Sequence, residues 1–186
     1  MTQTALVLID IQNDYFDGGR KPLEGMRAAA ANATRLLEHF RQHSLPVIHI
    51  RHIARSSEAP FFRPDTLGSE IHRTVQPREN EAVFEKTRPN AFVGTPLEKA
   101  LLDAEVDHVT LCGAMSQMCV DATARAAADI GFGVTVVEDS CAAAAVTFGA
   151  VSVPSTQVHA AIMAPLAASY GIVMSTDECL GSIASP

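Results

Sequence analysis

Short, unbroken apolar runs alternate with longer segments of helical periodicity along the chain. The runs that predict strands lie at residues 5–9, 46–50, 82–85, 108–112, 133–137 and 172–174. The segments that predict helices lie at residues 24–43, 95–104, 120–130 and 154–169. Uninterrupted apolar runs are typical of strands that are covered on both faces. Because strands and helices alternate, we predict an α/β fold with three layers, α/β/α, around a central, mostly parallel sheet.

Two segments have features beyond this alternation. The helix at 95–104 should begin with Thr95 as its N-cap, Pro96 in its first turn and Glu98 completing a capping box. The region 51–80 is rich in proline and has little periodicity. Irregular segments of this length in compact domains are usually functional. We therefore expect it to form a lid or a contact between subunits.

Composition and charge narrow the class of protein. The chain has 186 residues, 47% of them hydrophobic and 19% charged, which suits a single domain, residues 1–186, with a sizeable core. The formal net charge of −7 provides no basic surface for nucleic acid and disfavours anionic membranes. We see no signal peptide and no apolar run of the ~18 residues that span a bilayer.

The cysteines point to a reducing compartment. The chain has four: Cys112, Cys119, Cys141 and Cys179. Their spacing fits neither a CxxC zinc pattern nor a small disulfide framework. Together with the missing signal peptide, this spacing leads us to expect a reduced, cytoplasmic protein.

Cys119 follows a predicted strand and a short turn, at the start of a predicted helix. The free N–H groups and the positive dipole end of a helix favour an anion at this place. A thiol in this position is biased toward the thiolate, which is the nucleophilic form. The sequence therefore makes Cys119 a candidate nucleophile.

Asp10 and Lys86 also stand at the ends of predicted strands. The carboxyl ends of parallel strands meet at one edge of the sheet, so both side chains can converge with Cys119. A carboxylate can then take the thiol proton, and an ammonium can stabilise the thiolate. Taken singly, each residue has an ordinary interpretation: a turn former, a solvated lysine and a small buried side chain. Their joint placement favours catalysis.

The whole chain resembles the isochorismatase-like cysteine hydrolases, a superfamily that includes nicotinamidases, N-carbamoylsarcosine amidohydrolases and streptothricin hydrolases. The resemblance is carried, in order and spacing, by residues 5–14, 84–92, 112–127, 134–142 and 175–178. The stretches 47–52 and 156–160 are most similar to the streptothricin-hydrolase-like branch.

This resemblance implies a Rossmann-like fold and specific roles. Cys119 would be the nucleophile, Asp10 the general base and Lys86 the third member of a catalytic triad. A cis peptide bond between Ala114 and Met115 would turn the backbone N–H groups of Met115 and Cys119 into an oxyanion hole. The implied activity is amide hydrolysis through a Cys119 thioester. The expected substrate is a small amide, lactam or ureido compound, and the expected assembly is a homodimer or homotetramer.

The chain departs from its relatives at three places. Nicotinamidases carry an Asp-x-His metal motif after the second strand, and the stretch from His49 to His52 lacks the aspartate. We therefore predict no metal, no cofactor and a substrate other than nicotinamide. Isochorismatases proper lack the cysteine, so the presence of Cys119 favours amide chemistry. Relatives often have Thr-His where this chain has Ser116-Gln117.

Several side chains near the triad in sequence are candidates for substrate contact: Phe16, His52, Arg88, Phe92, Ser116 and Gln117. For the two phenylalanines, core packing is an equally good interpretation, and for Arg88 a solvated surface is the default. Two alternative functions stay open for the whole chain. It could be a non-catalytic, oligomeric binding protein, or a redox sensor that forms a reversible sulfenic acid at Cys119.

Overall fold

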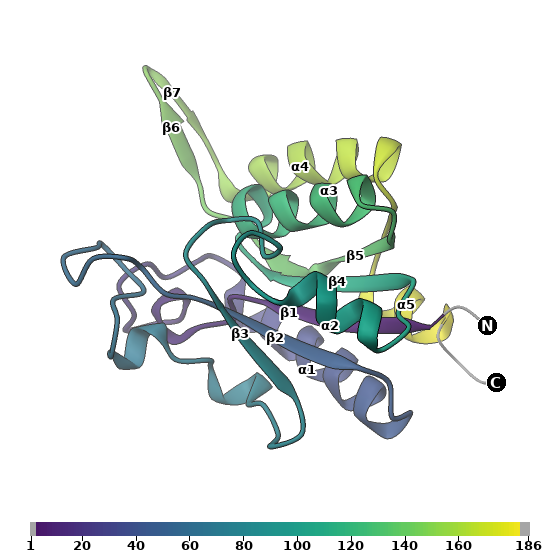
Figure 1. Cartoon of the computed structure of the whole chain (residues 1–186). Helices are drawn as coiled ribbons and strands as arrows, with labels where there is room; N and C mark the ends of the chain where they lie inside the picture. The colour runs from purple at the N-terminus through teal and green to yellow at the C-terminus, as the bar shows by residue number, and fades with distance from the viewer. Residues whose placement is uncertain (1–2, 183–186) are drawn as a thin grey trace.

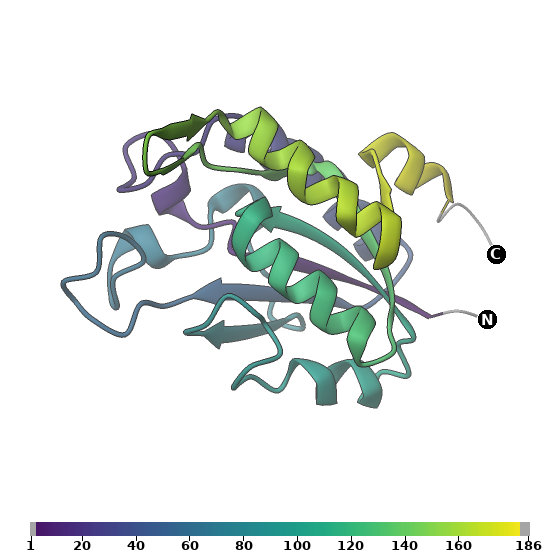
Figure 2. The ribbon, with the colours of Figure 1, turned by 90° about the horizontal axis from the view of Figure 1, so that it is seen from above.

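The computed structural model describes residues 3–182 and contains a six-stranded parallel sheet between two helical layers (Figure 1 and Figure 2). The strands follow one another across the sheet in the order β3 (Ala82–Lys86), β2 (Val47–His52), β1 (Thr4–Ile9), β4 (His108–Ala114), β5 (Gly133–Ala142) and β8 (Ile172–Met174). All neighbouring pairs are parallel. This confirms the predicted three-layer α/β/α fold.

The helices divide between the two faces of the sheet. They are α1 (Met26–Gln42), α2 (Leu97–Asp103), α3 (Asp121–Asp129), α4 (Ser155–Ser169) and α5 (Thr176–Ser182). Helices α2, α3 and α4 share one hydrophobic cluster with the sheet, and α1 and α5 share the other. Within residues 3–182, no helix combines the length and the apolar character needed to cross a membrane.

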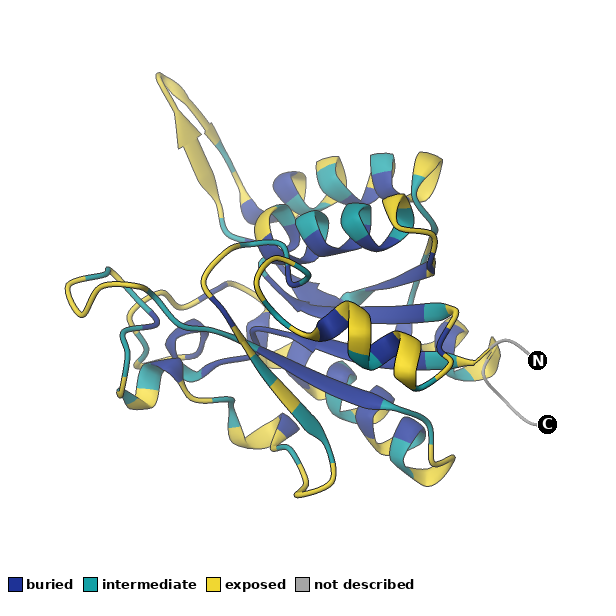
Figure 3. Ribbon diagram, viewed as in Figure 1, coloured by how far each residue is buried: buried dark blue, intermediate teal, exposed yellow. Residues whose placement is uncertain are grey.

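Strand β1 shows why its apolar run is uninterrupted. Ala5, Val7 and Ile9 face the α2–α3–α4 cluster, whereas Leu6 and Leu8 face the α1 cluster. Successive side chains of a strand point to opposite faces, so both faces must be apolar when helices cover both. Figure 3 shows the result, with buried strands at the centre and exposed outer faces on the helices.

The structure corrects the predicted start of α2. The helix begins at Leu97, and Pro96 rather than Thr95 is its N-cap residue. The hydroxyl of Thr95 still accepts a hydrogen bond from the N–H of Leu97 at 3.2 Å. Thr95 therefore supports the first turn from one position further out than we predicted, because Pro96 has the transitional backbone conformation of a cap.

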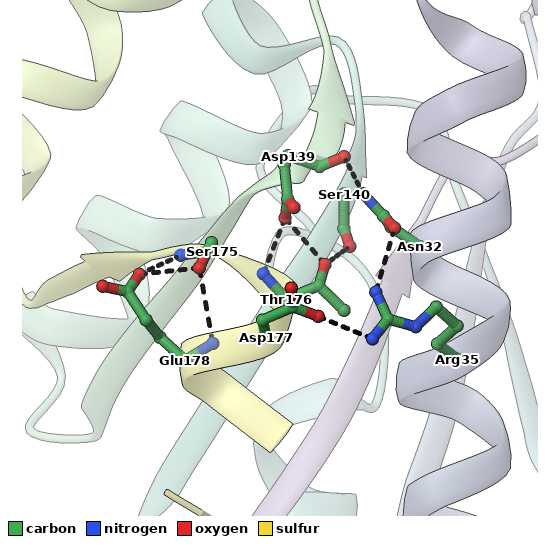
Figure 4. Close-up of polar contacts among 8 residues, drawn as sticks. All are labelled: Asn32, Arg35, Asp139, Ser140, Ser175, Thr176, Asp177 and Glu178. Carbon is green, nitrogen blue, oxygen red and sulfur yellow. Dashed lines mark hydrogen bonds and ion pairs between the residues drawn. The ribbon is translucent and has the colours of Figure 1, made fainter. Parts of the chain in front are cut away.

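Sequence periodicity did not predict α5, which is fastened to the sheet by polar contacts (Figure 4). Ser175 and Glu178 form a capping box: the Ser175 N–H donates to Glu178 Oε2, and the Glu178 N–H donates to Ser175 Oγ. The buried Thr176 donates from both its N–H and its hydroxyl to Asp139 Oδ1 on β5, at 2.8 and 2.7 Å. The S-x-x-E spacing is the signal that could have located this helix.

A two-stranded antiparallel hairpin was also missed. Its strands, β6 (Val146–Phe148) and β7 (Val151–Val153), project from the body of the molecule between β5 and α4 (Figure 1). The Phe148 side chain is 91% exposed. Each strand has three residues, too few for a clear alternating pattern in the sequence.

Gly113, near the end of β4, is required by close packing against β1. Its φ is +126°, and a Cβ atom at this position would overlap the carbonyl oxygen of Ile9. We expect Gly113→Ala to lower the free energy of unfolding by about 3 kcal/mol or more, measured by urea denaturation. Gly181→Ala is the control, because a Cβ in that turn of α5 meets open space. Equal stability of the two variants would contradict this packing account.

Candidate active site

The three predicted catalytic side chains meet at the carboxyl edge of the sheet. Asp10 follows β1 directly, and Lys86 is the last residue of β3. Cys119 lies in η4 (Ser116–Val120), a single π-helical turn that joins β4 to α3. Asp10 is 0%, Lys86 1% and Cys119 5% exposed. A charged pair this deep in a protein requires close partners.

The Lys86 ammonium has those partners. Its Nζ donates to Asp10 Oδ2 at 2.6 Å and to Cys119 Sγ at 3.1 Å. A third contact, at 3.0 Å, joins it to His52 Nδ1 at the end of β2. The other carboxylate oxygen, Asp10 Oδ1, is buried with no hydrogen-bond partner in the described part of the chain. Asp10 therefore has an oxygen free to accept a proton.

The charge state of the thiol differs from the predicted bias toward thiolate. Burial raises the pKa of the Cys119 thiol, the Asp10 charge raises it further, and Lys86 only partly opposes them. The physical reason is the sum of charges: Asp10 and Lys86 already neutralise each other, so a thiolate would leave a buried negative charge. Moving the thiol proton onto Asp10 keeps the sum at zero. The geometry thus supports proton transfer inside the site rather than a standing thiolate.

Lys86 itself stays charged. Burial lowers the pKa of its ammonium, but the charges of Asp10 and Cys119 raise it more, and the net shift is upward. Lys86 is therefore a cation in the resting site. Without moving, it can balance a negative charge on either Asp10 or Cys119.

The turn before Cys119 has the predicted backbone. The peptide bond between Ala114 and Met115 is cis, as the resemblance implied. The Met115 carbonyl accepts hydrogen bonds from the N–H groups of Met118 at 3.0 Å and Val120 at 3.2 Å. This pattern folds the turn back on itself and places Cys119 beside the cis peptide. The oxyanion-hole role of the Met115 and Cys119 N–H groups stays a prediction.

Comparison of the sequence and the fold with known proteins shows the family of this chain. The family model described as the isochorismatase domain matches residues 4–178. The chain belongs to the isochorismatase family. An uncharacterised member, YddQ of Bacillus subtilis, is 45% identical over 95% of this chain and 98% of its own length. A streptothricin hydrolase from Streptomyces noursei is 33% identical over 73% of this chain and 53% of its own. The crystal structure of a protein from Oleispira antarctica, described as an isochorismatase hydrolase, superposes with a TM-score of 0.94, at 45% identity over 97% of each chain.

Within this isochorismatase-family fold, the candidate substrate contacts occupy different surroundings. His52 touches Lys86, as described above. The Ser116 hydroxyl is buried and lies 2.9 Å from Nδ1 of His159 on α4. The Gln117 side chain forms two hydrogen bonds with the backbone of Ala144, in the segment that leads to the hairpin. Ser116 and Gln117 therefore tie the nucleophile turn to its neighbours.

Within residues 3–182, the remaining candidates form no hydrogen bond or ion pair with Asp10, Lys86 or Cys119. The Phe16 ring stacks on His72 with 3.6 Å between centroids, beside a cavity of about 660 Å³. The Phe92 ring stacks on Phe132 at 6.3 Å and packs against the core. Arg88 is exposed. Their role in binding substrate stays a prediction.

The sequence interpretation missed Gln12, whose buried amide holds His52. Gln12 Oε1 accepts from the His52 N–H at 2.7 Å, and Gln12 Nε2 donates to the carbonyls of His52 at 2.9 Å and Ser69 at 2.7 Å. Only its place two residues after Asp10, in the motif shared with the family, could have drawn attention to it. Gln12 links the loop after β1 to β2 and to the 51–80 region.

Tyr15 is a second missed neighbour. The side chain is 1% exposed, and burial together with the charges of Asp10 and Cys119 raises the pKa of its phenol. The ring packs edge-on against Phe62, with 4.6 Å between centroids. The phenol therefore stays protonated near neutral pH, close enough to Asp10 and Cys119 to feel their charges.

Proposed function

We propose that this isochorismatase-family protein is a metal-independent cysteine amidohydrolase that cleaves a C–N bond in a small amide, lactam or ureido compound. The observation that carries the proposal is the Lys86 ammonium, which lies within hydrogen-bond distance of both Asp10 and Cys119. A carboxylate, a thiol and a fixed cation share one buried site, which supports the proposed roles of base, nucleophile and counter-ion.

The first half of the reaction makes a thioester. Asp10 takes the Cys119 proton, and the thiolate attacks the substrate carbonyl carbon. The N–H groups of Met115 and Cys119 stabilise the oxyanion. The tetrahedral intermediate collapses, the C–N bond breaks, and Asp10 gives its proton to the leaving nitrogen. The amine departs and the acyl group remains on Cys119 Sγ.

The second half restores the enzyme. Asp10, again a carboxylate, takes a proton from water while the water oxygen attacks the thioester carbon. The C–S bond breaks, the acid product leaves, and the proton returns to the Cys119 sulfur. Lys86 remains an ammonium throughout, so that the negative charge is balanced whether it lies on Asp10 or on Cys119.

Two observations restrict the substrate. Cys119 is 5% exposed, so the scissile carbonyl must reach a recessed sulfur, which favours small molecules over folded proteins. The relative from Streptomyces noursei is named for hydrolysis of streptothricin, a small molecule, and shares 33% identity with this chain. Both support a hydrolase of small compounds.

The test is a panel of lactams, ureides and aromatic amides, assayed for release of ammonia or amine. We expect the wild type to turn over at least one compound. In Cys119→Ala the rate of that turnover should fall about 10³-fold or more. Cys179→Ala is the matched control, because this buried thiol lies on α5, on the opposite face of the sheet from α3. Full activity in Cys119→Ala would contradict the proposal.

A further inference from the structure

Three side chains surround the Lys86 ammonium in the manner of ligands around a metal ion. Asp10 Oδ2, His52 Nδ1 and Cys119 Sγ lie 2.6, 3.0 and 3.1 Å from Nζ. A carboxylate oxygen, an imidazole nitrogen and the sulfur of this set all lie within 4.8 Å of one another. An ammonium has three hydrogens to donate and no lone pair, so this arrangement uses its full capacity.

His52 is held in this arrangement as a neutral acceptor. Because the ammonium can only donate, Nδ1 must carry the lone pair and the ring proton must be on Nε2. Burial lowers the pKa of the His52 imidazole, and the Lys86 charge lowers it further. The Gln12 amide fixes the His52 backbone through two hydrogen bonds, and the Phe62 ring lies 6.0 Å from the imidazole.

The same three atom types are the preferred protein ligands of zinc. Thiolate sulfur binds Zn²⁺ at about 2.3 Å, and imidazole nitrogen and carboxylate oxygen bind it at about 2.0–2.2 Å. From their distances to Nζ, each ligand atom would need to move inward by about 1 Å or less to reach a metal at the ammonium position. The buried ammonium both fills that position and repels a second cation.

We propose that Asp10, His52 and Cys119 form a cation site whose resident cation is the Lys86 ammonium, and that removing the ammonium opens the site to a thiophilic divalent cation such as Zn²⁺. On this account His52 belongs to the catalytic centre as a positioning residue, not as a substrate contact. The proposal concerns the arrangement of the side chains and holds whichever substrate the enzyme uses.

The experiment compares two variants that remove the same charge. Lys86→Ala empties the position of the ammonium, whereas Lys86→Leu fills more of that space with an uncharged chain that offers no metal ligand. Titration with Co²⁺ should produce a sulfur-to-cobalt charge-transfer absorption in Lys86→Ala, with affinity at least ~100-fold above that of the wild type. Lys86→Leu should show no such gain. Zn²⁺ should raise the thermal midpoint of Lys86→Ala alone.

Further variants assign the ligands. The double variant Lys86→Ala/Cys119→Ala should lose both the absorption and the Zn²⁺-dependent stabilisation completely. The double variant Lys86→Ala/His52→Leu should lose most of both. The first also controls for metal bound by the remaining cysteines. Equal Co²⁺ binding by wild type and Lys86→Ala would overturn the proposal. So would a Lys86→Ala protein that gains neither the charge-transfer absorption with Co²⁺ nor a higher thermal midpoint with Zn²⁺.

Discussion

Asp10→Asn is expected to reduce amide turnover by about 10²–10⁴-fold while it makes Cys119 more reactive toward iodoacetamide. The two effects have opposite signs because Asp10 acts on the thiol in two ways. Its carboxylate is the proton acceptor of the proposed reaction, and its charge is one of the causes that raise the pKa of Cys119. Without that charge, a Cys119 thiolate becomes the natural counter-ion of the Lys86 ammonium.

The measurement is the rate of Cys119 alkylation as a function of pH, followed by mass spectrometry of the peptide that contains it. In the wild type, labelling should accelerate only above the usual thiol pKa of about 8.5, whereas in Asp10→Asn it should accelerate at lower pH. Asp17→Asn is the control, since that carboxylate is 73% exposed and pairs with Arg27. Slower labelling of Asp10→Asn than of wild type would contradict the charge balance described here.

Lys86→Met should cause the largest loss of stability, about 3–5 kcal/mol, because it leaves the Asp10 carboxylate buried without its cation. The folded-state pKa of Lys86 is raised, so the stabilisation it provides is fully present below the unfolded lysine pKa of about 10.4. It is lost only as the pH rises through the higher folded value. The ionisation of Lys86 itself therefore adds no pH dependence to the difference between wild type and variant from about pH 6 to pH 9.

Urea denaturation at several pH values measures this difference. The control is Lys99→Met, because Lys99 is 76% exposed and its pair with Asp103 contributes little. Its effect should stay within about 0.5 kcal/mol. Equal stability of the two lysine variants would show that the Asp10–Lys86 pair does not stabilise the fold.

The layers of this fold could be predicted because hydrophobic periodicity is a direct consequence of burial. Strand β1 is covered on both faces and therefore reads as an unbroken apolar run. The hairpin around Phe148 could not be found in this way, because its strands are exposed and short. Helix α5 depends on the polar network of Thr176 and Asp139, which brings together residues 37 positions apart. Such contacts have no local periodicity.

The convergence of Asp10, Lys86 and Cys119 was predictable because they mark the carboxyl ends of strands, where parallel sheets form their sites. The charge state of these side chains could not be predicted, because it depends on how deeply the site is buried and on the sum of its charges. The sequence suggested a thiolate at a helix end, whereas burial and the Asp10 charge raise the pKa of the Cys119 thiol. Likewise, nothing in the spacing of His52 and Lys86 indicated that they would touch.

The buried thiol also bears on the alternative of a redox sensor. Sensor cysteines are exposed and have a low pKa, so that peroxide meets a thiolate. Cys119 is 5% exposed and its pKa is raised, mainly by burial. These properties favour a thiol that is activated only when a substrate carbonyl and Asp10 act on it together.

The most direct test of the catalytic account is to trap the acyl group on Cys119. Wild-type protein is mixed with an active amide from the panel, quenched in acid within one turnover and digested for mass spectrometry. We expect the peptide that contains Cys119 to gain the mass of the acyl part of the substrate, and to lose it on treatment with hydroxylamine. Steady turnover with Cys119 unmodified, or with the acyl group on another residue, would contradict the account.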